Sequence, residues 1–321
     1  MTFKALVARE NAVAFEELDE LPPEGVTVDV AYSSLNYKDA LAVTRRGKIV
    51  RKFPMILGID LAGTTESGEQ VLAVGQGLGE SEWGGYTTRE RVREDALVPL
   101  PAGMSLEQAM QIGTAGFTAM LCVLALERND VRPRDRQVAD NDREIVVTGA
   151  AGGVGSIAVL LLAKLGYRVA ASTGRPELED YLRALGATSI IPREELSTDR
   201  GPMQKERWAG GIDTVGGTTL ANLFAQTAYG GAIACCGMAG GHELNTAVWP
   251  LILRNVSLLG VSSIRTPRAQ RIAAWSRLAQ DIDFAKLAEL SRTEPLSKIF
   301  ELSEEILAGQ TRGRVVIDPS A

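Results

Sequence analysis

The chain has 321 residues, of which 45% are hydrophobic and 23% are charged, as expected for a soluble globular protein with room for two domains. Its formal net charge of −6 argues against a nucleic-acid partner and against an anionic membrane surface. One histidine and three cysteines cannot supply a His/Cys zinc site or a disulfide framework, so we expect no metal and a cytoplasmic location. The first residues, MTFKALVARENAVAF, lack the apolar core of a secretory signal.

Short strands and turns are predicted over the first hundred residues. Residues 3–7 and 26–30 alternate between apolar and polar side chains, which is typical of half-buried strands. Residues 54–63 and 71–74 predict further strands, and residues 83–87 predict a turn into another. This pattern indicates a small β-rich domain.

The period of the hydrophobic pattern changes at Ser105. Residues 105–127 follow a helical pattern that is interrupted by Gly113 and by a second glycine. Ser105 and Gln108 form a candidate capping box at its start. Residues 128–143 are polar and charged, and they predict a surface loop.

A buried strand, a glycine-rich turn and an apolar helix follow one another over residues 144–165. A second strand at 167–171 completes a βαβ unit, which is the context that a dinucleotide site requires. Side chains in the turn would keep the backbone away from a pyrophosphate, and the N–H groups that begin the helix face the phosphate oxygens. We therefore predict a pyrophosphate site, rather than merely a tight turn, at Gly152, Gly153, Val154 and Gly155.

The end of the second strand predicts which cofactor binds. An NAD site usually carries an acidic residue there for the ribose 2′-hydroxyl, whereas an NADP site has small hydroxyls and an arginine. This chain has Ser172, Thr173, Gly174 and Arg175, with no carboxylate before Glu177. The hydroxyls can donate to a 2′-phosphate and Arg175 can bind it bidentately, so we expect NADPH. The alternative is a surface arginine that begins the next helix.

Four more strands complete a predicted six-stranded, doubly wound parallel sheet, in which strands alternate with helices. They are expected at 189–191, 212–217, 231–237 and 256–261. Cys235 and Cys236 are expected to be buried strand residues without reactivity. The remaining tail predicts two helices and a last strand, 314–317, that returns to the first domain.

Motifs in this chain resemble those of the medium-chain dehydrogenase/reductase superfamily. Residues 36–39 (NYKD), 58–60 (GID), 113–119 (GTAGFTA) and 149–155 resemble its quinone-oxidoreductase branch. The combination of SLNYKDAL, FPMILGID, GTAGFTAMLCVLALE, DTVGG and LILRNVSLLGV is narrower and is similar to the acrylyl-CoA reductase (NADPH) family. The resemblance covers nearly the whole chain.

The chain also departs from its relatives. Zinc-dependent members carry Gly-His-Glu with the histidine as a metal ligand, whereas this chain has Ile59 there and lacks the four-cysteine zinc lobe. Residues 63–71 look shorter than the usual family loop, and residues 134–143 look longer. We expect both to be surface changes, of which the first can alter the mouth of the cleft.

The resemblance implies a zinc-free medium-chain reductase fold. A GroES-like, β-rich catalytic domain is expected over 1–118 and 264–321, and a Rossmann domain that binds NADPH over 119–263. The implied reaction reduces the 2,3 double bond of acrylyl-CoA to propionyl-CoA by hydride transfer to the β-carbon. Two alternatives remain open, an NADPH:quinone oxidoreductase of the zeta-crystallin type and a non-catalytic NADPH-binding redox sensor.

This chemistry needs two oriented molecules, hydrogen-bond donors at the thioester oxygen and a proton for the α-carbon. The resemblance places Tyr37 in the cleft, where its phenol contacts nicotinamide or substrate or relays a proton. The alternative for Tyr37 is packing behind a strand. Asp39 and Asp60 are expected to orient Lys38 or Tyr37, or else to cap a turn.

Further cofactor contacts follow from the resemblance. Arg193, at the end of the third strand of the sheet, is placed near the 2′-phosphate, unless it pairs with a neighbouring glutamate. Thr114 lies in a loop that approaches the nicotinamide. Met238 and Ser263 are also candidates on the cofactor side, although a methionine after a strand is more often a core residue.

A basic stretch and a strand at the sheet edge indicate partners. Arg45, Arg46 and Lys48 suit the phosphates of coenzyme A, the alternative being a solvated surface. The strand at 256–261 lies at the sheet edge, and in the superfamily such a strand commonly pairs with its mate in a second subunit. We therefore expect a homodimer.

Overall fold

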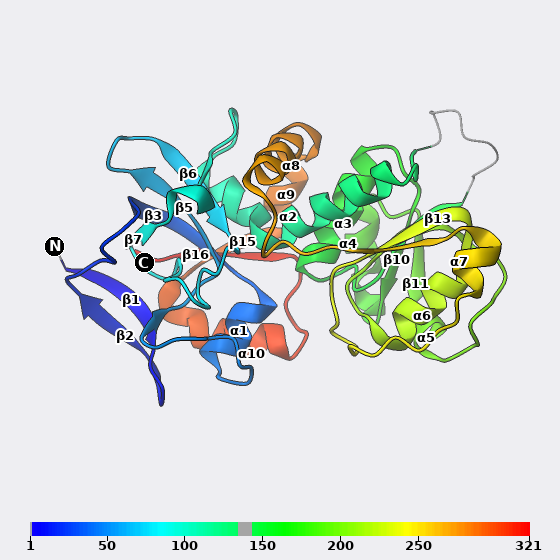
Figure 1. Ribbon diagram of the computed structural model, residues 1–321, viewed down its shortest axis with the longest axis horizontal. Helices are drawn as coiled ribbons and strands as arrows, with labels where there is room; N and C mark the ends of the chain where they lie inside the picture. The colour runs from blue at the N-terminus through cyan, green and yellow to red at the C-terminus, as the bar shows by residue number, and fades with distance from the viewer. Residues whose placement is uncertain (1, 134–142) are drawn as a thin grey trace. The chain divides into compact units, whose positions relative to one another are not determined.

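The computed structural model describes residues 2–133 and 143–321. It divides into two compact units, coloured by position along the chain in Figure 1. Unit 1 comprises Met1–Phe117, Ser263–Gln280 and Leu287–Ala321, and unit 2 comprises Thr118–Ser262 and Asp281–Lys286. Residues 134–142, which hold most of the expected surface loop and of the expected long insertion, lie outside the described residues.

Unit 1 contains two β-sheets, so the prediction of a β-rich domain is confirmed. The larger sheet has seven strands in the order β15-β16-β3-β5-β6-β8, with β7 paired to β3. The smaller sheet has three strands in the order β2-β1-β4. The strands are Phe3–Ala8 (β1), Val13–Leu18 (β2), Val26–Leu35 (β3), Met55–Ile56 (β4), Asp60–Thr65 (β5), Gln70–Val74 (β6), Arg89–Val92 (β7), Val98–Pro99 (β8), Ser291–Pro295 (β15) and Arg314–Asp318 (β16).

Strand β16 lies inside the larger sheet of unit 1. It runs antiparallel to β3, with Val315 opposite Leu35, and parallel to β15. Its side chains pack in a buried cluster with Leu6 of β1 and with Ile299 of helix α10 (Ile299–Leu307). The predicted return of the last strand to the first domain is therefore confirmed.

Two solvent-facing strands, helix α1 (Tyr37–Val43) and one short helix of the tail were not predicted. Strands β2 and β15 lie at sheet edges, and most of their side chains are exposed or half-buried. Because little of either strand is buried, neither shows the clear alternation that marks a half-buried strand. The tail holds α8 (Arg268–Asp281), α9 (Phe284–Glu289) and α10 rather than two helices, since α9 is only six residues long.

The predicted central helix runs over Leu106–Arg128 (α2). Its capping box is confirmed, because the Ser105 N–H donates to Gln108 Oε1 at 2.9 Å and the Gln108 N–H donates to Ser105 Oγ at 3.1 Å. The helix is long and apolar enough to cross a membrane, but 89% of its most apolar window is buried, as in a core helix. It is broken at Gly113, where φ is +52° and ψ is −160°.

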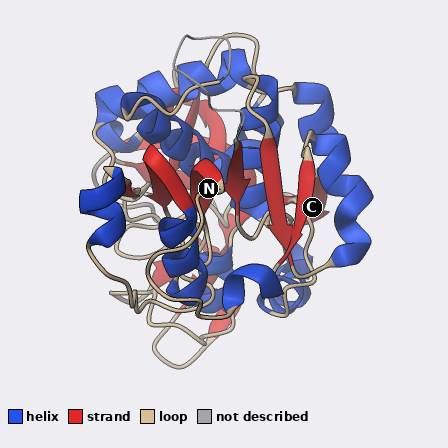
Figure 2. Ribbon diagram, turned by 90° about the vertical axis from the view of Figure 1, so that its right-hand side faces the viewer, coloured by secondary structure: helices blue, strands red, loops and turns tan. Residues whose placement is uncertain are grey.

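Unit 2 contains the predicted six-stranded parallel sheet, in the order β11-β10-β9-β12-β13-β14. Helices α3 and α4 contact each other, as do α5 and α6, and the helices lie beside the strands in Figures 1 and 2. The strands are Glu144–Val147 (β9), Val169–Thr173 (β10), Ser189–Pro192 (β11), Trp208–Asp213 (β12), Thr227–Cys235 (β13) and Ser257–Gly260 (β14). The helices are Gly153–Lys164 (α3), Glu179–Leu185 (α4), Glu194–Ser197 (α5), Gly217–Gln226 (α6) and Trp249–Arg254 (α7).

Two strands of this sheet begin earlier than predicted. Strand β12 starts at Trp208 and ends at Asp213, because Gly216 and Gly217 have φ values of +75° and +56° and lead into α6. The expected burial of Cys235 and Cys236 is also wrong, since β13 ends at Cys235 and both thiols are half-buried. The strand order reverses between β9 and β12, and ligands of such sheets bind at the carboxyl edge beside that point.

Candidate active site

The glycine turn after β9 leads directly into the N-terminus of α3. Gly149 has φ of +57°, and its carbonyl accepts the Gly152 N–H at 2.9 Å. The Ala150 N–H donates to the Ser172 carbonyl at 3.1 Å, which fixes the turn against the end of β10. Helix α3 has no acidic residue in its first turn, so its positive end is available to an anion.

The glycines of this turn differ in what requires them. A Cβ on Gly155 would overlap the Gly149 carbonyl oxygen, and a Cβ on Gly149 would overlap the Thr214 hydroxyl. A Cβ on Gly152 would meet no atom closer than the Gly149 oxygen, at 3.3 Å. The packing of the chain itself therefore requires Gly149 and Gly155, whereas Gly152 leaves its backbone open to a ligand.

Two arginines, Arg175 and Arg193, are tied by their backbone N–H groups to the end of β10. The Arg175 N–H donates to Thr173 Oγ1 at 3.0 Å, and the Arg193 N–H donates to the Thr173 carbonyl at 2.9 Å. A Cβ on Gly174 would lie 2.5 Å from the Arg193 Cζ, so the Arg193 side chain lies directly over this glycine. Ser172 and Thr173 are buried beneath the loop.

The contacts of Arg175 and Arg193 bear on the alternatives of a surface arginine and of an ion pair with a neighbouring glutamate. Arg175 is half-buried and donates to the Ala151 carbonyl at 3.2 Å, so its side chain reaches the glycine turn. Glu195 pairs with Arg207 at 2.9 Å, and no ion pair of Arg193 is found among residues 2–133 and 143–321. The Arg193 guanidinium therefore lies at the end of β10, where a 2′-phosphate is expected, and the Arg175 guanidinium lies beside the glycine turn.

Asp60 lies at the centre of a buried polar cluster in unit 1. Its Oδ2 accepts from Ser34 Oγ at 2.5 Å, from Asn36 Nδ2 at 2.9 Å and from the Thr114 N–H at 2.8 Å. Its Oδ1 accepts from Thr114 Oγ1. The carboxylate thus receives four hydrogen bonds and ties β5 to the break in α2.

Arg314 supplies the positive charge of this cluster. Its guanidinium donates to Ser34 Oγ at 2.9 Å, to the Gln111 carbonyl at 3.1 Å and to the Leu35 carbonyl at 3.2 Å. Burial lowers the pKa of Arg314, whereas Asp60 and Asp39 raise it. This residue was not predicted, although an arginine at the start of the apolar strand RVVID is an unusual feature that signals it.

Asp39 caps helix α1 (Tyr37–Val43) rather than orienting its neighbours. Its Oδ2 accepts the Asn36 N–H at 2.9 Å and its Oδ1 accepts the Ile59 N–H at 2.9 Å. Lys38 instead pairs with Glu80 at 2.8 Å. Of the two interpretations proposed for Asp39, the structure shows the cap, because the third helical position directs the carboxylate back to the N-terminus of the helix.

Asp60 satisfies neither of the interpretations offered from the sequence. It caps no turn of its own strand, and its hydrogen bonds run to Ser34, Asn36 and Thr114 rather than to Lys38 or Tyr37. The first position of β5 points its side chain into the interior, below the break in α2.

Burial shifts the pKa of Asp39. Its pKa is raised to about 7, first by desolvation and second by the negative charge of Asp60. The pKa of Tyr86, whose hydroxyl donates to the Ser34 carbonyl at 3.2 Å, is raised for the same reasons. The cluster thus holds two carboxyls against one guanidinium.

Three other predicted residues are placed as follows. Tyr37 begins α1 and is 52% exposed, which excludes packing behind a strand. Met238 follows β13 and is 70% exposed, which excludes the core alternative. Ser263 is half-buried at the start of the second segment of unit 1.

The basic stretch after α1 is only partly free. Arg45 donates to the Glu10 and Asn11 carbonyls at 2.6 and 2.5 Å. Arg46 forms two hydrogen bonds with Glu304, at 2.8 and 2.9 Å. Lys48 is exposed, and no ion pair of its ammonium is found in the described parts of the chain. Of these three cations, Lys48 would lose the fewest existing interactions on binding a phosphate.

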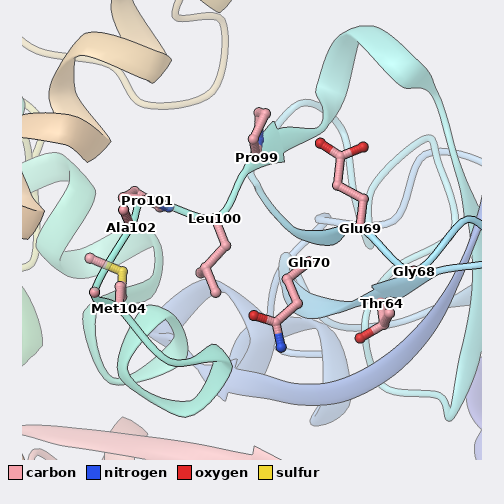
Figure 3. A pocket seen from close by; sticks show the side chains of 10 residues that line it. Thr64, Gly68, Glu69, Gln70, Pro99, Leu100, Pro101, Ala102 and Met104 are labelled. Carbon is pink, nitrogen blue, oxygen red and sulfur yellow. The ribbon is translucent and has the colours of Figure 1, made fainter.

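An open hollow of about 560 Å³ lies elsewhere in unit 1, and Figure 3 shows the side chains that line it. The short β5–β6 turn contributes Gly68, Glu69 and Gln70, and the facing segment runs from Pro99 to Met104. No residue predicted from the sequence to act in catalysis or binding lines it. Among the described residues no group of three or more His, Cys, Asp or Glu is arranged to hold a metal ion.

Comparison with known proteins agrees with both units. The alcohol dehydrogenase GroES-like domain matches residues 22–102, and the zinc-binding dehydrogenase family matches residues 153–280. The chain is 50% identical over 318 residues to a probable acrylyl-CoA reductase of Escherichia coli (strain K12), covering 96% of each chain. It is 47% identical over 321 residues to an acrylyl-CoA reductase of Ruegeria pomeroyi, covering 97% of this chain and 95% of that one.

Solved structures are equally similar. An oxidoreductase of Salmonella enterica in complex with NADP has a TM-score of 0.92 and 48% identity, covering 99% of each chain. A Bacillus subtilis protein with NAD bound has a TM-score of 0.93 and 41% identity, also covering 99% of each chain. Identity at this level over nearly the full length shows that the chain belongs to the acrylyl-CoA reductase family of the medium-chain dehydrogenase/reductase superfamily, within its quinone-oxidoreductase-like branch.

Proposed function

We propose that the chain is an NADPH-dependent oxidoreductase that reduces the 2,3 double bond of acrylyl-CoA to give propionyl-CoA. The observation that carries this proposal is the near-full-length identity to two acrylyl-CoA reductases, at 50% and 47%. Two arginines follow β10 where NAD sites usually carry a carboxylate: the Arg193 guanidinium lies over Gly174 and the Arg175 guanidinium reaches the Ala151 carbonyl of the glycine turn, and both support NADPH as the cofactor.

Residues of unit 2 suit the phosphates of this cofactor. The backbone of residues 152–155 suits a pyrophosphate, and Ser172, Thr173, Gly174, Arg175 and Arg193 suit a 2′-phosphate. Met238 and Ser263 are assigned to the cofactor side, and Thr114 to the nicotinamide. When bound, NADPH supplies the hydride that reaches the β-carbon of the enoyl thioester.

The chain's own contribution is orientation and hydrogen bonding. Negative charge develops on the thioester oxygen as the β-carbon is reduced, and a positioned hydroxyl stabilises that charge. Tyr37, half-exposed at the N-terminus of α1, is the phenol assigned to donate to the reacting oxygen or to relay the proton to the α-carbon. Lys48, with Arg45 and Arg46 beside it, is assigned to the phosphates of coenzyme A.

The proposal divides these roles between two domains. Residues 1–118 and 264–321 form the catalytic domain, and residues 119–263 form the domain that binds NADPH. The buried apolar helix α2 and the family suit a soluble enzyme, and we assign it to the cytoplasm.

We also propose that the protein is a homodimer. Strand β14 lies at an edge of the parallel sheet, and within the described residues only β13 pairs with it. Helix α7, which immediately precedes it, exposes Trp249 and Ile252 at 53% and 73%. A second copy meeting β14 through a two-fold axis would pair both edges and cover both helices.

A second candidate function is reduction of quinones by NADPH. The chain is 43% identical over 331 residues to a putative quinone oxidoreductase of Bacillus subtilis, covering 98% of each chain. A non-catalytic NADPH sensor is the third, since an intact glycine turn serves binding alone.

One experiment distinguishes the three candidates. NADPH consumption is followed with acrylyl-CoA and with a simple quinone, and each assay is repeated with NADH. Rapid turnover of acrylyl-CoA with NADPH is expected. Turnover of the quinone alone would assign the protein to the second function. NADPH binding without turnover of either substrate would assign it to the third.

A further inference from the structure

We infer that Asp60 is a positioning residue for hydride transfer, because its carboxylate fixes Thr114 at the break in helix α2. This inference rests on the proposed function, which assigns Thr114 to the nicotinamide. It concerns hydrogen bonds that lie within unit 1, between residues 60 and 114.

The break in α2 creates a helix start that its own sequence does not cap. Gly113 is non-helical, so a regular helix starts again at Thr114. The first N–H groups of a helix have no carbonyl of the same helix to bond to and need other acceptors. A helix start usually receives a side-chain oxygen from the residue before it, but Gly113 has no side chain. Asp60, from β5, takes that place by accepting the Thr114 N–H at 2.8 Å and the Thr114 hydroxyl.

The glycine at the break is required by this arrangement. A Cβ on Gly113 would lie 2.6 Å from Arg314 Nη2 and 2.7 Å from both Asp60 Oδ2 and Ser34 Oγ. The chain therefore passes within van der Waals distance of the buried cluster at the point where Thr114 is held. Ser34 Oγ donates to this carboxylate at 2.5 Å and itself accepts from the Arg314 guanidinium at 2.9 Å.

Two bonds to one residue fix its orientation as well as its place. A hydrogen bond to the backbone N–H alone would leave the Thr114 side chain free to change its χ1 rotamer. The second hydrogen bond, to the hydroxyl, also fixes χ1. The pyrophosphate and 2′-phosphate contacts belong to unit 2 and do not involve Asp60. Disturbing Asp60 should therefore slow the chemical step far more than it weakens NADPH binding.

The test is a double-mutant cycle on Asp60 and Thr114. The carboxylate accepts at both oxygens, whereas Asp60→Asn offers one acceptor and opposes a donor with a second donor. We expect kcat to fall at least tenfold, with the Kd for NADPH changed less than threefold. Thr114→Val should lower kcat as well, and Thr114→Ser should restore it, because serine keeps the hydroxyl.

Coupling is the decisive result. If Asp60 acts through Thr114, the double variant Asp60→Asn/Thr114→Val should be little slower than Asp60→Asn alone. The inference would be overturned if the loss of kcat in the double variant equalled the product of the two single losses. Equal kcat values for Thr114→Val and Thr114→Ser would also overturn it. The matched control is Glu90→Gln, a buried carboxyl of the same unit outside this cluster, which should leave kcat unchanged.

Two further measurements separate the possible failures. Thermal unfolding shows whether each variant is folded. If Asp60→Asn does not fold, the comparison of kcat between Thr114→Val and Thr114→Ser tests the inference instead. The fluorescence of bound NADPH reports the nicotinamide environment without turnover, and Asp60→Asn should shift it. If the wild type fails to reduce acrylyl-CoA, the proposed function is wrong. If the emission of NADPH bound to Asp60→Asn at saturation is the same as in the wild type, the role of Asp60 is overturned.

Discussion

Glycine residues of one turn serve two different purposes in this protein. Gly155 has no room for a Cβ because the Gly149 carbonyl occupies that space, while a Cβ on Gly152 would need only a small shift of the Gly149 oxygen, 3.3 Å away. Packing within the chain does not strictly require a glycine at position 152, so in the proposed function we attribute this glycine to the pyrophosphate. Substitutions at Gly155 should therefore affect folding, and substitutions at Gly152 should affect binding.

Gly152→Ala should weaken NADPH binding with little loss of stability. We expect the Kd for NADPH to rise about tenfold or more, which corresponds to about 1.4 kcal/mol, because a methyl group would stand between the backbone and the pyrophosphate. The melting temperature of the unliganded protein should change by no more than about 2 °C. Gly155→Ala is the matched comparison, and it should lower the melting temperature clearly. Equal effects of both changes on stability would contradict this interpretation.

Arg175 should determine the preference for NADPH over NADH. A bond between a guanidinium and a phosphate contributes about 1.5 to 3 kcal/mol, so Arg175→Ala should lower kcat/KM for NADPH roughly 10- to 100-fold. The value for NADH should stay within about twofold, since NADH lacks the phosphate. Arg207→Ala, which removes an arginine paired with Glu195, is the control. An equal loss with both cofactors would show that Arg175 supports the fold instead.

The buried carboxyl of Asp39 should make the protein less stable as pH rises. Its folded pKa, about 7, lies above its ordinary value of 3.8, so between about pH 4 and 7 the folded state holds a proton that the unfolded state has lost. The free energy of unfolding should fall in that window by up to about 1.4 kcal/mol per pH unit. Denaturant unfolding of Asp39→Asn should show a smaller slope. Glu17→Gln, at an exposed position of β2, should keep the wild-type slope.

Helix α2 shows how far local sequence carries a prediction. The helical period of residues 105–127 and the capping box at Ser105 are local signals, and the structure confirms both. The reason for a glycine at position 113 could not be predicted, because its spatial neighbours Asp60 and Arg314 are distant in the sequence. Arg314 reaches Gln111 across 203 positions.

The strands show the same division. The βαβ unit around residues 144–171 has strong periodicity and a glycine turn, and both of its strands are found, β9 where it was predicted and β10 two residues later. Strand β15 was missed because its sequence, SRTEP, is polar and lies at an edge. Asp60 and Thr114 were each recognised as candidates, but their pairing was not, because no sequence pattern links a strand residue to a helix break 54 positions away.

At the scale of the whole molecule, the exposed side chains of α7 should determine assembly. We expect a dimeric mass by light scattering for the wild type. Ile252→Asp places a charge on the most exposed apolar side chain of α7 and should shift the equilibrium to monomers, because an unpaired charge is costly in an interface. Phe15→Asp, at another exposed apolar position in unit 1, should leave the dimer intact. A monomeric wild type would remove the dimer from the proposal.

The position of β16 has a consequence for how the protein is made. The strand enters the interior of a sheet whose other members include β3, and Arg314 bonds to Ser34 across 280 positions. Unit 2 is nearly continuous in sequence, so it can fold on the ribosome while unit 1 still lacks a strand and the buried cation. Until residue 318 has been synthesised, Asp60 and Asp39 have no guanidinium beside them, so a nascent chain can complete a nucleotide-binding fold well before it can assemble the polar cluster that holds Thr114.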